Sequence, residues 1–184
     1  MITRVEAFAL VTERIPQQNL ISHCVATEVL MGALARHLGK CAEEVEAWEI
    51  AGLLHDLDYA ETAEDPDRHG LVTVEELEDR IDPRMAHAIL AHACKAERES
   101  DMDHALWCAD PTTGFIVAAA LVRAEKKLSA VEVKSLKKRW KEKAFARGAD
   151  REQMAGHEAL GIERDEYLTL CLTAMQARAG ELGL

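Results

Sequence analysis

The stretch GLLHDLD, residues 52–58, places two adjacent ionisable side chains, His55 and Asp56, at the end of an apolar run. Such a run normally faces a protein core, where uncompensated polar groups cost free energy. The stretch that follows, LDYAETAEDPDR at residues 57–68, is acidic, contains a proline and lacks periodicity. The pattern therefore predicts a buried helix over about 42–56 that ends at the doublet, and a loop over 57–68.

Helical periodicity continues on both sides of this stretch. Further helices are predicted at about 3–13, 19–38, 70–80, 83–97, 103–110, 113–124, 129–147, 150–161 and 163–180. No segment alternates for long enough to predict a strand. Gly and Pro are few and only 4% of the residues are aromatic, which also favours helices over sheets. The expected fold class is all-α, a helical bundle.

Several boundaries rest on capping and stop signals. Pro111 is expected to separate the helices at 103–110 and 113–124, because proline cannot donate the helical hydrogen bond. Ser129 with Glu132 has the capping-box spacing, and Asp150 with Gln153 repeats it. These pairs predict the starts of the two helices that lead into the C-terminal region of the chain.

Length and composition limit the classes of protein to consider. The 184 residues predict one domain, 1–184. The five cysteines form no C-x-x-C pair, so we expect reduced, mostly buried thiols. No signal peptide opens the chain and no apolar stretch reaches 18 residues, so we expect a soluble cytoplasmic protein that does not enter the membrane. The net charge of −11 disfavours nucleic acid as a partner.

Three of the eight histidines, His23, His55 and His92, lie on apolar stripes of three different predicted helices. A single buried histidine is usually a core residue bonded to a backbone carbonyl. Three on inward faces, one of them beside Asp56, should converge on something that compensates their burial. A metal ion is the simplest explanation, since imidazole and carboxylate ligands together suit Zn, Fe, Mn or Ni.

The ordered set of His23, the His55-Asp56 doublet and Asp110 resembles the HD-domain (HDIG-related) metal-dependent phosphohydrolase superfamily. GLLHDLD is similar to the family's doublet region, and ALWCAD, residues 105–110, resembles the segment that supplies its last aspartate. The resemblance covers about residues 18–125. It implies an HD-domain-like helical bundle as the core, with the C-terminal helices, about 126–184, packed on it.

Two further histidines match the additional ligands of binuclear family members. His69 in RHG and His92 in ILAHA occupy the corresponding places in order. The resemblance implies one metal bound by His23, His55, Asp56 and Asp110, and a second bound by His69, His92 and a bridging Asp56. The implied cofactor is one or two divalent ions among Mn, Fe, Ni, Zn and Mg.

The activity that the resemblance implies is hydrolysis of a phosphoester of a small metabolite or nucleotide by a metal-activated water. Two alternatives stay open: a di-iron oxygenase of the same fold, and a non-catalytic regulatory module that binds metal or ligand. The sequence departs from the family pattern after the doublet, where Leu57, Asp58 and Tyr59 replace Ile-Gly-Lys, and at His92-Ala93. The Gly-Tyr-Pro element of cyclic-dinucleotide phosphodiesterases is absent, which disfavours that substrate.

Asp56 and Asp58 are the candidate catalytic residues. Asp56 would position the nucleophile, whereas Asp58 either orients a ligand histidine or carries a proton, or is a loop or cap residue. Residues 123–147 hold ten Lys and Arg against three Glu. Within them Lys137, Lys138 and Arg139 are candidates for a phosphate-binding rim, and the alternative is a solvated helix face.

Overall fold

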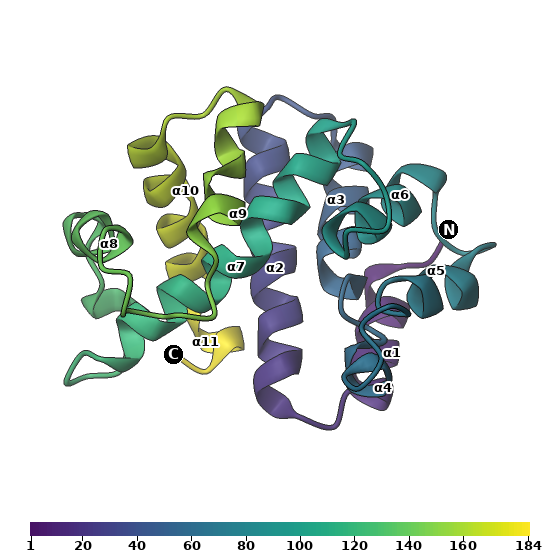
Figure 1. Cartoon of the computed structure of the whole chain (residues 1–184), viewed down its shortest axis with the longest axis horizontal. Helices are drawn as coiled ribbons and strands as arrows, with labels where there is room; N and C mark the ends of the chain where they lie inside the picture. Colours follow the sequence, from purple (N-terminus) through teal and green to yellow (C-terminus); the bar gives the residue numbers. More distant parts are fainter.

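Every regular element of the structure is helical, and no strand is present (Figure 1). The computed structural model describes residues 1–184. The elements are α1 (Arg4–Arg14), α2 (Gln18–His37), α3 (Ala42–Leu54), α4 (Tyr59–Thr62), α5 (Leu71–Leu77), α6 (Pro83–His92), α7 (Asp101–Leu121), η1 (Leu128–Ala130), α8 (Val133–Trp140), α9 (Arg151–Met154), η2 (Ala155–Leu160), α10 (Arg164–Ala177) and α11 (Ala179–Leu182). The predicted all-α fold class is confirmed.

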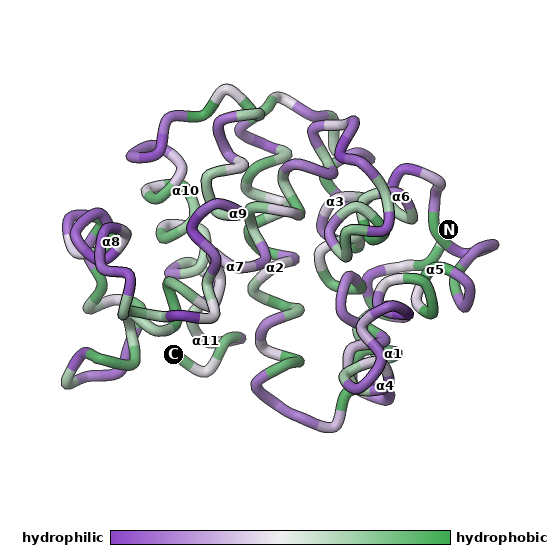
Figure 2. Tube along the Cα trace, viewed as in Figure 1, coloured by the Kyte–Doolittle hydropathy of each residue, from purple (hydrophilic) through white to green (hydrophobic).

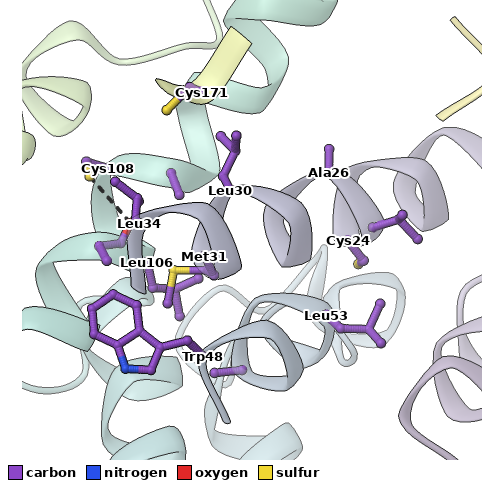
Figure 3. Packing of buried hydrophobic residues seen from close by; sticks show 14 of the residues in the cluster. Cys24, Ala26, Leu30, Met31, Leu34, Trp48, Leu53, Leu106, Cys108 and Cys171 are labelled. Atoms are coloured by element: carbon purple, nitrogen blue, oxygen red, sulfur yellow. Dashed lines mark hydrogen bonds between the residues drawn. The ribbon is translucent and has the colours of Figure 1, made fainter. Parts of the chain in front are cut away.

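Helix α2 is the central element, and helices from both halves of the chain pack on it. Its neighbours include α1, α3, α7, α10 and α11. Leu30, Met31 and Leu34 are fully buried; Figure 3 shows Met31 on the side of α2 that faces Trp48 of α3 and Leu106 of α7, and Leu30 on the side that faces Cys171 of α10. Burial of each such side chain stabilises the fold by roughly 1.5–3 kcal/mol. The helix is thus held from several sides, which fixes the direction of every side chain along it.

Helix α3 approaches α2 closely at Gly52. A Cβ atom at this position would lie 2.8 Å from Cγ of Met31 and 2.9 Å from the carbonyl oxygen of Thr27. Only glycine allows this distance between the two backbones without a shift of one helix. The contact sets the end of α3, and with it the His55-Asp56 doublet, against α2.

Helix α7 differs from the prediction, because it runs without interruption from Asp101 to Leu121 with Pro111 inside it. Pro111 removes one helical hydrogen bond, a cost of about 3 kcal/mol that packing can offset. The side chain is buried, and the helix packs on α2, α6 and η2 around it. The carbonyl that loses its helical donor is that of Trp107, and the next one, of Cys108, receives hydrogen bonds from the Thr112 and Tyr167 hydroxyls at 2.7 and 2.9 Å, which tie this part of α7 to α10. Tertiary contacts therefore override the local stop signal.

Two further boundaries near the doublet were predicted wrongly. The expected loop at 57–68 contains the short helix α4, and the helix expected to reach residue 97 stops at His92. A turn ends α6: Cys94 has a φ of 57°, and the amide of Lys95 donates to the carbonyl of Leu90 at 2.8 Å. This is the hydrogen bond of a Schellman motif with a residue other than glycine in the left-handed position.

Of the two helix starts predicted from capping signals in the C-terminal region, the one at Asp150 is confirmed. Asp150 accepts hydrogen bonds from the amides of Glu152 and Gln153, as its spacing predicts. The prediction for Ser129 is wrong, because α8 begins only at Val133 and already ends at Trp140. Residues 141–150 instead form turns, whose carbonyls accept hydrogen bonds from the guanidinium of Arg151.

The buried apolar residues form one cluster of 45 that reaches from the first helix to the last. Figure 2 shows hydrophobic positions along the central helices, whereas α8 is mostly hydrophilic. All five cysteines are free; Cys24, Cys108 and Cys171 are buried, and Cys41 and Cys94 are exposed. None of the helices combines the length and the apolar character needed to span a membrane.

Candidate metal centre

The six predicted metal ligands lie close together, although they come from five separate segments. They are His23 on α2, His55 at the end of α3 with Asp56 after it, His69 just before α5, His92 at the end of α6, and Asp110 within α7. Two sets of three have all their ligand atoms within 4.8 Å of one another: His23, His55 and Asp56, and Asp56, His69 and His92. Asp56 belongs to both sets.

The doublet can act on one centre because α3 ends there. Consecutive side chains in mid-helix point about 100° apart. His55 is the C-cap residue, and the next residues form a turn in which the amide of Leu57 donates to the carbonyl of Leu54 at 3.0 Å. As a result His55 Nε2 lies 3.4 Å from Asp56 Oδ2.

The two carboxylate oxygens of Asp56 face two different pairs of histidines. Oδ2 lies 3.4 Å from Nε2 of both His23 and His55. Oδ1 lies 3.4 Å from Nε2 of His69 and 3.5 Å from Nε2 of His92. One buried carboxylate therefore stands between two imidazole pairs, which is the arrangement of a bridging ligand.

Asp110 adds a second carboxylate to only one of these pairs. Its Oδ1 lies 3.2 Å from His23 Nε2 and 3.9 Å from His55 Nε2. The first group thus contains two imidazoles and two carboxylates. The second, around His69 and His92, contains two imidazoles and shares Asp56.

Helix ends orient two of the histidines. His55 and His92 each reach back to the carbonyl three residues earlier, so that Nδ1 donates to Gly52 O at 2.8 Å and to Ile89 O at 2.6 Å. A protonated Nδ1 leaves the lone pair of Nε2 free to bind a metal. The sequence contains a signal for this partner at His55, which stands at a predicted helix end, but not at His92, whose helix was expected to continue to residue 97.

His23 is oriented by Thr113, which is not one of the predicted site residues. The Thr113 hydroxyl donates to the carbonyl of Asp110 at 2.8 Å, so its oxygen accepts from His23 Nδ1 at 2.9 Å. The spacing of three residues between Asp110 and Thr113 puts both on one face of α7. A hydroxyl at that spacing from a ligand carboxylate is the signal that could have identified it.

His69 is oriented by Asp58, which is almost completely buried. Asp58 Oδ1 accepts from His69 Nδ1 at 2.8 Å, and Oδ2 accepts from the amides of Gly70 and Thr73 at 2.8 and 3.0 Å. Burial alone would raise the pKa of Asp58, but the hydrogen bonds from His69 and Thr73 lower it. Both oxygens are taken by donors of the protein. This geometry fits the predicted orienting role of Asp58 and also makes it a cap of α5.

Gly70 makes the approach of His69 to His92 possible. It has a φ of +79°, and a Cβ atom there would lie 2.9 Å from the Cβ of Ala93. Both the left-handed conformation and the close contact with α6 require glycine. The two imidazoles on either side of this contact end with their Nε2 atoms 3.2 Å apart.

The arrangement of donors and acceptors fits a cation. When the four histidines are neutral and donate through Nδ1 to these partners, their Nε2 atoms present lone pairs toward the carboxylates of Asp56 and Asp110. Nε2 of His23 and of His55 are 3.2 Å apart, and no protein donor stands among these acceptors. Converging buried acceptors repel one another unless protons or metal ions lie between them. Imidazole and carboxylate are the ligands of divalent transition metals.

The pKa values indicate that, where no metal is bound, protons reduce the repulsion between these acceptors. Burial opposes a charge on His23, but hydrogen bonds to Asp110 and Asp56 outweigh it and raise its pKa to about 10. Burial lowers the pKa of His55 to about 4. Although burial would raise the pKa of Asp56, the neighbouring histidines lower it. The cluster therefore holds both carboxylates ionised and at least one imidazole protonated at neutral pH.

The centre opens into a cavity of about 530 Å³, named here the metal cavity, which His23, Asp56, His69, His92 and Asp110 help to line. Its other walls include Tyr59, Trp107 and Gln153. No Lys or Arg lines it. Without metal, the carboxylates of the cavity would repel an anionic ligand, and protonated imidazole would be the one positive charge available to attract it.

The basic candidates for a phosphate rim lie elsewhere. Lys137, Lys138 and Arg139 are on α8, at the opposite end of the molecule from α5 and α6 (Figure 1), and none of them lines the metal cavity. Lys137 pairs with Asp165, and Arg139 stacks over the ring of Phe145. The structure does not bring these three residues together with the metal ligands, and their surroundings fit the solvated face.

Comparison with known proteins gave one family. A family model described as HD domain matches residues 20–159, which extends past the predicted end of the core near residue 125. No curated protein and no solved structure shows a significant match.

Proposed function

Because the chain belongs to the HD-domain family, we propose that it is a metal-dependent phosphohydrolase that hydrolyses a phosphoester of a small metabolite or nucleotide. The observation that carries the proposal is the division of the Asp56 carboxylate between two histidine pairs. A carboxylate in this position can bridge two ions, and two-ion centres are suited to displacement at phosphorus.

Divalent ions held there would lower the pKa of a water molecule and balance the charge that develops on the phosphoryl oxygens. The protein orients the histidine rings. Thr113 and Asp58 bind Nδ1 of His23 and His69, and backbone carbonyls bind Nδ1 of the other two histidines. In the reaction, water oxygen bonds to phosphorus, the ester P–O bond breaks, and the released alcohol takes up a proton.

The walls of the metal cavity support metal dependence. Since no Lys or Arg lines the cavity, a phosphate group has no fixed protein cation to bind. Its affinity should therefore come from the ions. Phosphate binding should disappear when the ions are removed, which differs from a site where arginine or lysine holds the anion.

The test is metal content and turnover in Asp56→Ala. We expect about two ions per chain in the wild type, loss of both in the variant, and at least a hundredfold loss of activity on phosphate monoesters. Helical circular dichroism should change little. His104→Ala is the matched control, because His104 is also on α7 but outside the ligand set. Full metal retention in Asp56→Ala would refute the proposal.

The same purified protein separates the two alternative functions. Iron-loaded protein that consumes oxygen but cleaves no phosphoester would identify an oxygenase. Tight metal binding without turnover of any substrate in a broad panel would identify a regulatory module.

A further inference from the structure

A second cavity, of about 600 Å³, lies next to the metal centre. Its walls come from the first half of α2, the second half of α7, and α11. Figure 1 shows α11 beside the diverging ends of α2 and α7. His23 lines both this cavity and the metal cavity, and its hydrogen-bond partner Thr113 lines the second cavity as well. We call this space the α2–α7 cavity.

The two helices that carry His23 and Asp110 extend their ligand faces into the α2–α7 cavity. On α7, Gly114, Val117 and Leu121 line it, at four, seven and eleven residues beyond Asp110. This spacing keeps them on one helix face, about 6–16 Å along the axis from the carboxylate. A continuous stripe therefore leads from a metal ligand into the cavity.

Gly114 is an unusual residue at the centre of this stripe. Glycine inside a helix costs about 0.5–1 kcal/mol relative to alanine. Packing does not require it here, because a Cβ atom at Gly114 would meet no atom within 4 Å. Gly114 is exposed, and the missing side chain leaves the cavity wall open at this position, one residue after Thr113.

The walls define the chemistry of such a ligand. Apolar contacts come from Val117, Leu121 and Leu182, and uncharged polar groups come from Asn19 and Ser22. No Lys, Arg, Phe, Tyr or Trp lines the cavity, and the carboxylate of Glu181 is bound by Arg178. Leu121 is 50% exposed, so a bound aliphatic group would cover it. A volume of about 600 Å³ is within the range of small-molecule sites.

From these observations we propose that the α2–α7 cavity binds the organic part of the substrate, an uncharged aliphatic group, while its phosphoryl group lies at the metal centre. This assignment rests on the proposed function for the phosphoryl end. The aliphatic end rests on the cavity alone.

Alkylphosphonates of increasing length test the assignment, because their P–C bond is not hydrolysed and affinity is measured without turnover. With Mn²⁺-loaded protein, affinity should increase from methyl- to butyl- to hexylphosphonate, about threefold to fourfold for each methylene that is buried. A terminal carboxylate on the hexyl chain should remove the gain, since no cation lines the cavity.

Variants are compared by the ratio of hexyl- to methylphosphonate affinity within each protein. Gly114→Leu fills the cavity and should bring this ratio close to one, whereas Gly114→Ala adds a single methyl group and should keep the wild-type ratio. Leu121→Glu, at an exposed position, should lower the ratio without disturbing the core. Metal content and circular dichroism verify that each variant is folded.

A wild-type ratio near one, or an unchanged ratio in both Gly114→Leu and Leu121→Glu, would overturn the assignment. Hydrolysis of the matching alkyl phosphates separates it from the proposed function. Chain-length-dependent binding without hydrolysis of any ester leaves the cavity assigned and rejects the hydrolase. Hydrolysis without chain-length dependence does the reverse.

Discussion

A single carboxylate, that of Asp56, holds the candidate centre together. Its two oxygens face separate imidazole pairs, so a change at this one residue affects every ligand set at once. The four histidines are each oriented by one partner through Nδ1. Substitution of Asp56 should therefore affect metal binding by both ligand sets, whereas substitution of a residue that orients one histidine should affect only the set that contains this histidine.

Metal affinity should rise with pH because of His23. Before a metal binds, the carboxylates keep the pKa of His23 at about 10, above its value of about 6.5 in an unfolded chain. This proton stabilises the metal-free protein fully below pH 6.5, and the contribution is lost as the pH rises through about 10. A metal has to displace the proton, whereas His55, with a pKa of about 4, is already neutral.

Between pH 7 and 9 we therefore expect the affinity of the His23 set for Mn²⁺ to increase by about tenfold per pH unit, with release of about one proton for the ion that binds there. Calorimetric titrations in buffers of different ionisation enthalpy measure both quantities. Affinity that is independent of pH in this range, with no proton released, would show that His23 is not displaced.

The turn before α5 links a helix start to a metal ligand. Asp58 caps α5 through the amides of Gly70 and Thr73 and orients His69 with its other oxygen. The sequence predicted a helix here and three possible roles for Asp58: orienting a ligand histidine, carrying a proton, or serving as a loop or cap residue. The structure shows one carboxylate in both positions, because α5 begins two residues after the histidine.

Asp58→Ala should destabilise the protein and remove one ion. Three donors, two of them backbone amides, lose a buried acceptor, which should cost about 2–4 kcal/mol of unfolding free energy. Without its orienting bond, His69 should no longer hold the second ion, so stoichiometry should fall from two to one. Elemental analysis and denaturant unfolding measure these effects.

Asp82→Ala is the matched control for this variant. Asp82 caps α6 through the amides of Arg84 and Met85 but contacts no ligand histidine. Its loss should cost about 1 kcal/mol and leave two ions bound. Two ions in Asp58→Ala, or one in Asp82→Ala, would contradict the assigned role.

The candidate metal centre joins segments that are far apart in the chain. Charge is also distributed unevenly along the sequence. The candidate ligands span residues 23–110 and come from α2, α6 and α7, the end of α3 and the turn before α5. Residues 123–147 carry ten basic and three acidic residues, a net charge of +7. Since the whole chain has a net charge of −11, the remaining residues together carry −18. The basic segment lies away from the acidic centre.

Metal binding should raise the melting temperature of the whole chain. Ions at a free concentration of 100 Kd add about 2.7 kcal/mol to the unfolding free energy, if the unfolded chain does not bind them. For a chain of this length that corresponds to roughly 5–11 °C. Differential scanning calorimetry with Mn²⁺ and with chelator measures the shift. Asp56→Ala should show none, and a shift of equal size in that variant would place the ions elsewhere.

The sequence by itself was sufficient for the helical class and for four of the six residues at the candidate centre. Helical periodicity placed His23, His55 and His92 on apolar faces, and Asp56 follows His55 directly. His69 and Asp110 came from the resemblance, and so did the division of the six residues into two ligand sets.

Only the tertiary structure decided the rest. Helix α7 continues through Pro111 because packing against neighbouring helices offsets the cost of the proline, and Thr113 binds His23 across a separation of 90 residues in the chain. Lys137 lies far from the centre although its charge suggested a phosphate site, and Gly114 opens a cavity that no local signal marks. Local propensity acts over a few residues, whereas these features depend on free energies of contact between segments that the sequence does not place beside each other.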